Sequence, residues 1–307
     1  MAALPSRARI VDVGPRDGLQ NEKQMIAAEV KIELIDRLTG AGFKFIEATS
    51  FVSPKWVPQL ADGAQVMANI RRKPGVVYSA LVPNMKGYET ATAVPQPQWP
   101  DEIVVFAAAS EAFSQKNINC SIAESIARFA PVTAAAQRDG IHVRGAISCA
   151  LGCPYQGEVK PAAIELVARL MKEIGVEHCG VADTIGVGTP RATQAAMAAA
   201  LKIYDLPNVS GHFHDTYGQA VGNVYACLEM GISAFDSSVA GLGGCPYAKG
   251  ATGNVATEDV LYLLRGLDID TGIDLARVVE TGQWISGLLG RNSAGRAGTA
   301  LAAKMAA

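Results

Sequence analysis

"HCGVADTIG", residues 178–186, is followed by "TPRATQAAMAAALKIYD" at 189–205 and by "VSGHFHD" at 209–215. The first and third stretches are short, mainly apolar or small, and close with polar residues, which is typical of buried strands. The middle stretch has a helical pattern and is long enough to return the chain for a parallel strand. This part of the sequence therefore predicts one strand-helix-strand unit.

The same alternation runs along most of the chain. Strand-like runs begin with "ARIVDV" at 8–13 and end with "AFDSSVAG" at 234–241, and a helical stretch follows each run. Eight such units without an intervening linker predict a single-domain α/β fold over residues 1–307, a (β/α)8 TIM barrel. An additional C-terminal helix, "DLARVVETGQWISGLLG", and an alanine-rich tail would form an extension over residues 272–307. A six-stranded open, doubly wound sheet is the weaker alternative.

Composition narrows the class of protein. The chain has 307 residues, of which 49% are hydrophobic and 18% charged, so it can bury a large core. A net charge of -2 with scattered acids and bases argues against nucleic acid or membrane partners. No apolar run reaches the roughly 18 residues of a membrane span, and the N-terminus lacks the apolar centre of a signal peptide. The six widely spaced cysteines favour reduced thiols, and we expect a cytoplasmic protein.

A TIM barrel predicts where functional groups lie. They are expected at the carboxyl ends of the strands and in the loops that follow. Polar residues do occur at those places, namely Arg16, Asp17, Glu47, Thr49, Asp183, His212, His214, Asp215, Cys245 and Asn254. We therefore expect them to gather at one end of the barrel.

The spacing of His212 and His214 indicates a metal site. Side chains alternate across a strand, so both imidazoles share one face about 7 Å apart. With the carboxylate of Asp17 and the amide oxygen of Asn254 they offer a mixed nitrogen and oxygen set to one divalent ion. Mg²⁺ or Mn²⁺ suits the oxygen ligands, while the imidazoles also suit Zn²⁺ or Co²⁺. A hydrogen-bonded histidine pair without metal is the alternative.

Two loops carry further candidates. In "VGPRDGLQNE", residues 13–22, the planar fork of Arg16 can face a substrate carbonyl while Asp17 serves the metal, although a solvated turn would look similar. "GLGGCPYAKGATGN", residues 241–254, is rich in glycine and predicts a lid that carries Cys245 over the site. A buried structural cysteine is the alternative.

Five stretches together resemble the 3-hydroxy-3-methylglutaryl-CoA (HMG-CoA) lyase family. They are "VDVGPRDGLQNEK", "IEATSFVSPKWVPQLAD", "VADTIGVGTP", "GHFHDTYGQA" and "GLGGCPYAKGATGNVATED". The similarity runs from about residue 7 to the helix near residue 285. Related condensing enzymes carry Arg-Asp-Glu where this chain has Arg-Asp-Gly, and they have an added C-terminal regulatory domain that is not expected here. Both differences favour the lyase branch.

The resemblance implies cleavage of HMG-CoA to acetoacetate and acetyl-CoA, a step of leucine degradation and ketone body formation. It implies one divalent metal ion, Mg²⁺ or Mn²⁺, with the ligands Asp17, His212, His214 and Asn254. The implied substrate-binding residues are Arg16, Gln20, Glu47, Asp183 and Thr184. The implied catalytic residues are Arg16 at the thioester oxygen, Cys245 as proton donor, and His212 or Asp17 as the base.

The same residues are also compatible with other functions. A synthase of the same group would consume acetyl-CoA, and a non-catalytic acyl-CoA-binding protein would bind without turnover. A Schiff-base aldolase needs a lysine inside the barrel, and the sequence offers only Lys23 and Lys249 in loops near its mouth. A small-molecule acyl-CoA substrate and a homodimer are expected by analogy.

Overall fold

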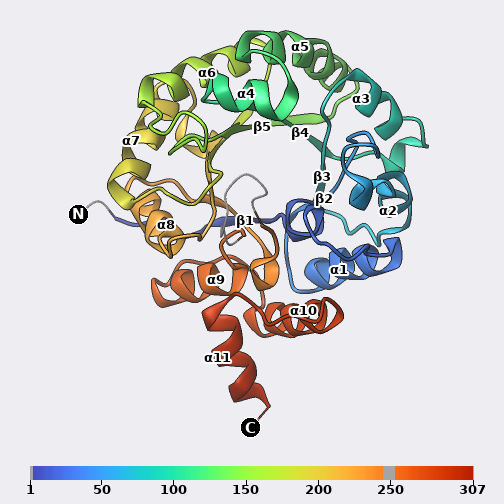
Figure 1. Cartoon of the computed structure of the whole chain (residues 1–307). Helices are drawn as coiled ribbons and strands as arrows, with labels where there is room; N and C mark the ends of the chain where they lie inside the picture. The colour runs from blue at the N-terminus through green and yellow to red at the C-terminus, as the bar shows by residue number, and fades with distance from the viewer. Residues whose placement is uncertain (1–2, 245–252, 307) are drawn as a thin grey trace.

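The computed structural model describes residues 3–244 and 253–306. Eight parallel strands close into a barrel in sequence order, with β8 pairing back onto β1 (Figure 1). The strands are β1 (Arg9–Asp12), β2 (Phe45–Ser50), β3 (Val77–Leu81), β4 (Glu102–Ala108), β5 (His142–Ser148), β6 (His178–Asp183), β7 (Val209–Phe213) and β8 (Ala234–Ser237). The predicted TIM barrel is confirmed, and the open doubly wound sheet is wrong.

Helices surround the barrel, and the last one projects from the ring that the others form (Figure 1). They are α1 (Ala28–Gly40), α2 (Gly63–Asn69), α3 (Met85–Ala91), α4 (Glu111–Ile118), α5 (Ile122–Arg138), α6 (Pro161–Glu173), α7 (Pro190–Leu201), α8 (Ala220–Glu229), α9 (Thr257–Gly266), α10 (Leu275–Leu288) and α11 (Arg296–Met305). Short helical turns are η1 (Gly14–Gly18), η2 (Pro58–Leu60), η3 (Gln96–Gln98), η4 (Leu206–Asn208) and η5 (Val239–Gly241). Among the described residues, none of these helices combines the length and apolar character that crossing a membrane requires.

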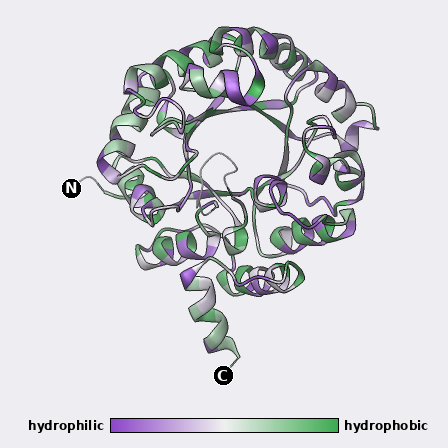
Figure 2. Cartoon of the chain, viewed as in Figure 1, coloured by the Kyte–Doolittle hydropathy of each residue, from purple (hydrophilic) through white to green (hydrophobic). Residues whose placement is uncertain are grey.

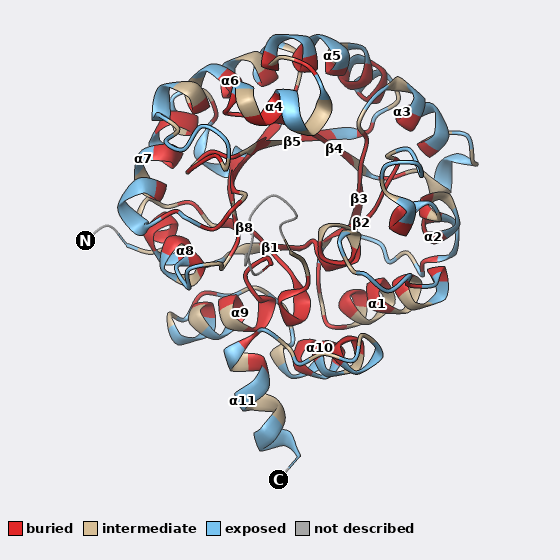
Figure 3. Cartoon of the chain, in the orientation of Figure 1, coloured by how far each residue is buried: buried red, intermediate tan, exposed pale blue. Residues whose placement is uncertain are grey.

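The main core lies between the barrel and the ring of helices. Buried residues follow the strands and the sides of the helices that face them, whereas the outer sides are exposed (Figure 3). Around each helix, hydrophobic and hydrophilic residues alternate, as the helical period requires (Figure 2). Ile46, Val105, Val181 and Phe235 are strand residues of this core that are fully buried. The short apolar runs in the sequence are therefore strands held by their outward side chains.

Local signals set several helix boundaries. A capping box opens α5, where Ser121 accepts a hydrogen bond from Glu124 N and the Glu124 carboxylate accepts from Ser121 N. Pro161 and Pro190 begin α6 and α7, at positions where no backbone donor is needed. Gly175 follows α6 with a φ of +86°, which a side chain would strain. Such signals explain why the strand-helix units could be located from the sequence.

The C-terminal helices pack against a buried acid. Helix α10 lies beside α1 and α9, and the alanine-rich tail forms a further helix, α11, that projects from the ring (Figure 1). Glu258 of α9 is 1% exposed, and both its carboxylate oxygens lie 3.0 Å from the amide nitrogen of Ala240, which donates to them. A Cβ on Gly282 would lie 2.4 Å from Glu258 Oε1, and one on Gly298 3.1 Å from its Cγ. Glycines thus let two C-terminal helices close over this carboxyl group.

Candidate metal centre and active site

Asp12, at the end of β1, fastens the loop that carries Arg16 and Asp17. Its Oδ1 accepts a hydrogen bond from Gly14 N at 2.9 Å, and its Oδ2 accepts from Val239 N at 3.0 Å and from Thr257 Oγ1 at 2.8 Å. The first turn after β1 is therefore tied to the chain that leaves β8. These hydrogen bonds join the loop after the first strand to the segment after the last strand, at the carboxyl ends of the strands.

The π-helical turn η1 packs tightly against the segment after β8. A Cβ on Gly18 would lie 2.7 Å from Leu242 Cβ and 2.9 Å from Ser238 Oγ. Any side chain at position 18 would push η1 away from that segment. The glycines of "GPRDG" therefore serve close packing, and the turn presents Arg16 and Asp17 with side chains that are only 11% and 20% exposed.

Asp17, His212 of β7 and His214, which follows β7, converge. The rings of His212 and His214 have centroids 5.3 Å apart, and one ligand atom from each of Asp17, His212 and His214 lies within 4.8 Å of the others. Asn254 joins this group, because its Nδ2 donates a hydrogen bond to Asp17 Oδ2 at 2.8 Å. The structure thus brings together the four residues that the sequence suggested as metal ligands.

The state of these groups fits a divalent cation. His214 Nδ1 is buried and has no hydrogen-bond partner among the described residues. Burial and the neighbouring His212 lower the pKa of His214 to about 4, so its ring is neutral and offers lone pairs. Burial alone would raise the pKa of Asp17, but Arg16 and the two imidazoles hold it well below its usual range. One ionised carboxylate and neutral imidazole nitrogen are the ligands that such an ion needs.

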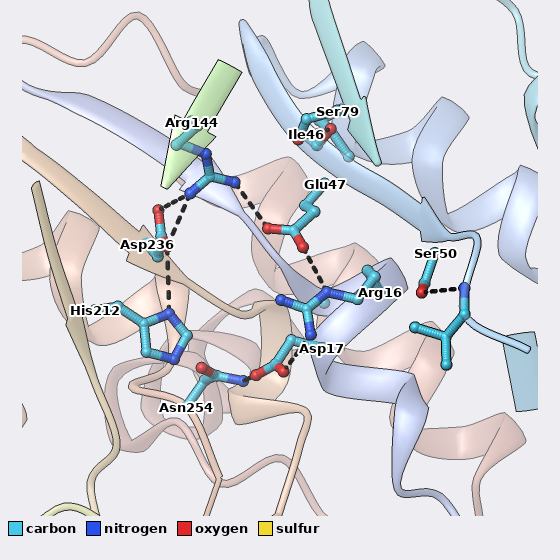
Figure 4. A network of polar contacts seen from close by, with 12 residues as sticks. Arg16, Asp17, Ile46, Glu47, Ser50, Ser79, Arg144, His212, Asp236 and Asn254 are labelled. Carbon is cyan, nitrogen blue, oxygen red and sulfur yellow. Dashed lines mark hydrogen bonds and ion pairs between the residues drawn. The ribbon is translucent and has the colours of Figure 1, made fainter. Parts of the chain in front are cut away.

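Further charged residues, Arg144, Asp236 and Glu47, lie on one side of His212 and Asp17 (Figure 4). His212 Nδ1 lies 3.2 Å from Asp236 Oδ2, and Arg144 binds the same carboxylate. Although burial opposes the charge, Arg144 and His212 lower the pKa of Asp236 to about 2. Burial lowers the pKa of His212, but Asp236 and Asp17 raise it above its usual value overall. A carboxylate at Nδ1 leaves Nε2 as the ring atom available to a metal.

Arg16 is held on two sides by acids. Its Nε donates to Glu47 Oε1 at 2.5 Å, and its Nη1 donates to Asp17 Oδ1 at 2.7 Å. Within the described part of the chain, Nη2 makes no hydrogen bond. The other oxygen of Glu47, Oε2, accepts a hydrogen bond from Arg144 Nη2, so both oxygens of Glu47 face guanidinium groups. This arrangement fixes the plane of the Arg16 fork beside the metal ligands and leaves one donor group for a substrate oxygen.

Asp183 is fully buried, and its carboxylate closes the loop after β6. Oδ1 accepts from Val187 N at 3.1 Å and Oδ2 accepts from Gly188 N at 2.8 Å. Burial raises its pKa, although these amides oppose the shift. Both oxygens of Asp183 are therefore already engaged in holding this loop, and a contact with substrate would have to be made in addition.

Thr184, the next residue, also has a local partner. Its Oγ1 accepts a hydrogen bond from Cys149 N at 2.7 Å. Cys149 has a φ of +56°, so this bond helps to hold an unfavourable backbone conformation. Gln20 is half-buried just after η1, and Cys245 lies outside the described residues.

Sequence reasoning missed Arg144 and Asp236. Both lie inside short, mainly apolar strands, in "HVRGAIS" and "AFDSSV". A charged residue in the middle of such a strand is the one available signal, because it must find a partner inside the barrel. The sequence does not show which partner that is.

The chain matches one protein family over most of its length. Residues 7–285 match the HMGL-like family. The chain belongs to the HMGL-like family. Among curated HMGL-like relatives, the 3-hydroxy-3-isohexenylglutaryl-CoA/hydroxy-methylglutaryl-CoA lyase of Pseudomonas aeruginosa is 56% identical over 98% of this chain and 99% of the relative. The predicted resemblance is confirmed.

Solved structures of HMGL-like proteins agree. The crystal structure of hydroxymethylglutaryl-CoA lyase from Pseudomonas aeruginosa has a TM-score of 0.95 to this chain at 56% identity, with 98% of this chain and 99% of the other covered. An HMG-CoA lyase from Acinetobacter baumannii, in complex with coenzyme A and 3-methylmalate, has a TM-score of 0.90 at 32% identity and covers 96% and 95%. Both similarities extend over nearly the whole of this chain and of the other protein.

Proposed function

We propose that this protein is a divalent-metal-dependent carbon-carbon lyase that cleaves HMG-CoA to acetoacetate and acetyl-CoA. Its family membership and its similarity to lyases over nearly the full chain support this activity. The observation that carries the proposal is the position of Arg16, which lies beside the cluster of Asp17, His212 and His214. A charge-stabilising donor next to a cation site is what this cleavage requires.

The cleavage step moves one proton and two electron pairs. The proton leaves the C3 hydroxyl of the substrate, the electrons of the broken O–H bond form the second bond of the acetoacetate carbonyl, and the C2–C3 electrons become the enolate of acetyl-CoA. A proton then adds to C2. A divalent cation held at this site would supply Lewis acidity, which would lower the pKa of the hydroxyl and favour binding of the substrate carboxylate. We propose Asp17, His212, His214 and Asn254 as its ligands.

Arg16 stabilises the developing enolate. Negative charge grows on the thioester oxygen as the C2–C3 bond breaks, and the free Nη2 of Arg16 can donate to that oxygen. Glu47 and Asp17 already hold the guanidinium, so little reorganisation is needed during the reaction. We expect this contact to matter more for turnover than for substrate binding.

Two residues can take the hydroxyl proton. Asp17 is ionised, and His212 is backed by Asp236, which stabilises a protonated ring. Either can act as the base only if its bond to the cation is weak. We propose Cys245 as the group that returns a proton to C2, and Gln20, Glu47, Asp183 and Thr184 as further residues that shape the substrate site.

A longer acyl chain is the second candidate substrate. The Pseudomonas aeruginosa relative is named for 3-hydroxy-3-isohexenylglutaryl-CoA as well as for HMG-CoA. Cleavage leaves the C3 substituent on the ketone product, so the same residues serve both substrates. Comparing kcat/KM for the two thioesters would establish which one this chain prefers.

The setting of the enzyme is also a proposal. We propose a cytoplasmic homodimer that acts in leucine degradation and supplies ketone bodies. Sedimentation velocity at several protein concentrations tests the dimer, and growth of a deletion strain on leucine tests the pathway. Normal growth of that strain would contradict the proposed role in leucine degradation.

The decisive assay measures acetoacetate released from HMG-CoA. Purified protein is treated with EDTA, and Mg²⁺ or Mn²⁺ is then added back. Release that stops with EDTA and returns with metal is expected. Formation of HMG-CoA from acetyl-CoA and acetoacetate at a much higher rate than its cleavage would favour a synthase. Tight binding of HMG-CoA without product under any metal would indicate a non-catalytic acyl-CoA-binding protein.

A further inference from the structure

Arg144 of β5 binds both Asp236 and Glu47 in the charged network inside the barrel (Figure 4). Its Nη2 donates to Glu47 Oε2 at 2.7 Å, its Nη1 lies 3.2 and 3.1 Å from the two oxygens of Asp236, and its Nε donates to Glu102 Oε1 at 3.1 Å. The Arg144 side chain is only 5% exposed. The proposed reaction assigns it no role.

Two of the three carboxylates that bind Arg144 also contact residues of the proposed active site. Asp236 Oδ2 lies 3.2 Å from His212 Nδ1, and Glu47 Oε1 accepts from Arg16 Nε at 2.5 Å. One guanidinium group is therefore joined, through one carboxylate each, to a proposed metal ligand and to the proposed enolate-stabilising residue. The two halves of the site, the metal ligands with His212 and the enolate-stabilising Arg16, are therefore both held by Arg144.

The geometry that holds both halves is specific to arginine. A planar fork can hold two carboxylates in fixed directions, whereas an ammonium group acts as a point charge without such a fork. The side chains of Asp236 and Glu47 are 7% and 1% exposed, so water cannot take the place of a lost partner. Without the fork, each carboxylate would turn or protonate, and the residue it holds would lose its orientation.

We propose that Arg144 is a positioning residue for both halves of the active site. Through Asp236 it fixes which nitrogen of His212 faces the cation, and through Glu47 it fixes the direction of the Arg16 fork. The first effect is independent of the reaction, whereas the second rests on the proposed lyase function.

Three variants separate the two effects. Asp236→Asn should weaken binding of Mn²⁺ to the metal-free protein by about 10-fold or more, because a group that orients a ligand is lost. Glu47→Gln should lower kcat at saturating Mn²⁺ and leave Mn²⁺ affinity within about twofold of the native value. Arg144→Lys, which keeps the charge, should show both defects. Electron paramagnetic resonance of free Mn²⁺ measures the affinity without substrate or turnover.

Glu102→Gln is the matched control. It removes the third ion pair of Arg144, and Glu102 contacts neither His212 nor Arg16. Its thermal stability should fall, while Mn²⁺ affinity and kcat stay near the native values. A loss of metal affinity equal to that of Asp236→Asn would reduce the network to a purely structural role and overturn the proposal.

A spectroscopic measurement covers the case in which Arg144→Lys folds poorly. The chain has only four histidines, so ¹⁵N-histidine labelling gives a simple spectrum. In native Mg²⁺-loaded protein, His212 should carry its proton on Nδ1, and Asp236→Asn should shift its ¹⁵N signals toward mixed tautomers. Native His212 signals and native Mn²⁺ affinity in Asp236→Asn would overturn the proposal. Protein that binds Mn²⁺ but releases no acetoacetate would defeat the lyase function and leave this test intact.

Discussion

Asn254 donates a hydrogen bond from Nδ2 to Oδ2 of Asp17 over 2.8 Å, although the two residues are 237 positions apart. Asp17 follows the first strand and Asn254 follows the last. Their contact depends on the pairing of β1 with β8, which closes the barrel. The proposed metal centre is therefore assembled by barrel closure and not by any local segment.

His214→Ala should abolish retention of the metal. The variant removes a buried, neutral imidazole from the set of proposed ligands, and the remaining groups cannot replace its nitrogen. Dialysis followed by elemental analysis should find metal in the native protein and little in the variant. His142→Ala is the control, because that ring is exposed and pairs with Glu177 at the other end of the barrel. Equal metal content in native protein and His214→Ala would remove His214 from the ligand set.

Arg16→Ala should lower kcat by about 10²–10³ with little change in KM, because its contact strengthens as the enolate forms. Steady-state kinetics at saturating Mg²⁺ provide both constants. Mn²⁺ titration of the same variant checks that the cation site persists without Arg16. Unchanged kcat would contradict the assignment of Arg16 to the enolate.

Gly18→Ala should destabilise the protein by about 1–3 kcal/mol, the usual cost of overpacking. The new methyl group would lie 2.7 Å from Leu242 Cβ, so η1 and Asp17 must move. Urea unfolding measures the stability, and Mn²⁺ affinity should fall as well. Gly287→Ala is the control, since it meets nothing within 4 Å and lies in α10. Native stability in Gly18→Ala would show that η1 is free to shift.

Glu258→Gln should change how stability depends on pH. Burial raises the pKa of Glu258 from 4.5 to about 8, and the nearby Asp12 adds to the shift. Between these values the folded protein keeps a proton that the unfolded chain has lost, so this group lowers the free energy of unfolding as pH rises. Glutamine has no proton to lose. The free energy of unfolding of the variant relative to native protein should therefore rise by up to about 1.4 kcal/mol per pH unit in this window.

Urea unfolding at several pH values measures that difference. Asp274→Asn provides a comparison, because Asp274 is an exposed helix cap that is not among the groups shifting the pKa of Glu258. A difference between Glu258→Gln and native protein that does not vary with pH would mean that the carboxyl group is ionised in the folded state.

Cys245→Ser should keep fold and metal but lose most activity. A hydroxyl group has a much higher pKa than a thiol and is a poorer proton donor to an enolate. Circular dichroism, metal content and turnover together test this expectation. Cys120→Ser is the control, because Cys120 is a buried residue in the connection between α4 and α5. Full activity in Cys245→Ser would return Cys245 to a structural role.

Much of the fold could be predicted because the barrel repeats one local pattern. Each strand is a short buried run, and its helix carries its own start and stop signals. Helix α4 was missed, because few of its residues are buried and "EAFSQKNI" has no clear apolar face. Arg144 and Asp236 were missed for a different reason. That Arg144 binds Asp236 and Glu47 depends on which strands face one another across the barrel interior, and one sequence does not contain that information.

The pairing of β1 with β8, from Arg9 with Ala234 to Asp12 with Ser237, has a consequence for biosynthesis. A nascent chain on the ribosome cannot close the barrel before β8 has been synthesised and has left the exit tunnel. Until then β1 is an open edge, and open strand edges bind other chains. A chaperone can therefore bind the unfinished chain, whereas the proposed metal site forms only after the barrel has closed.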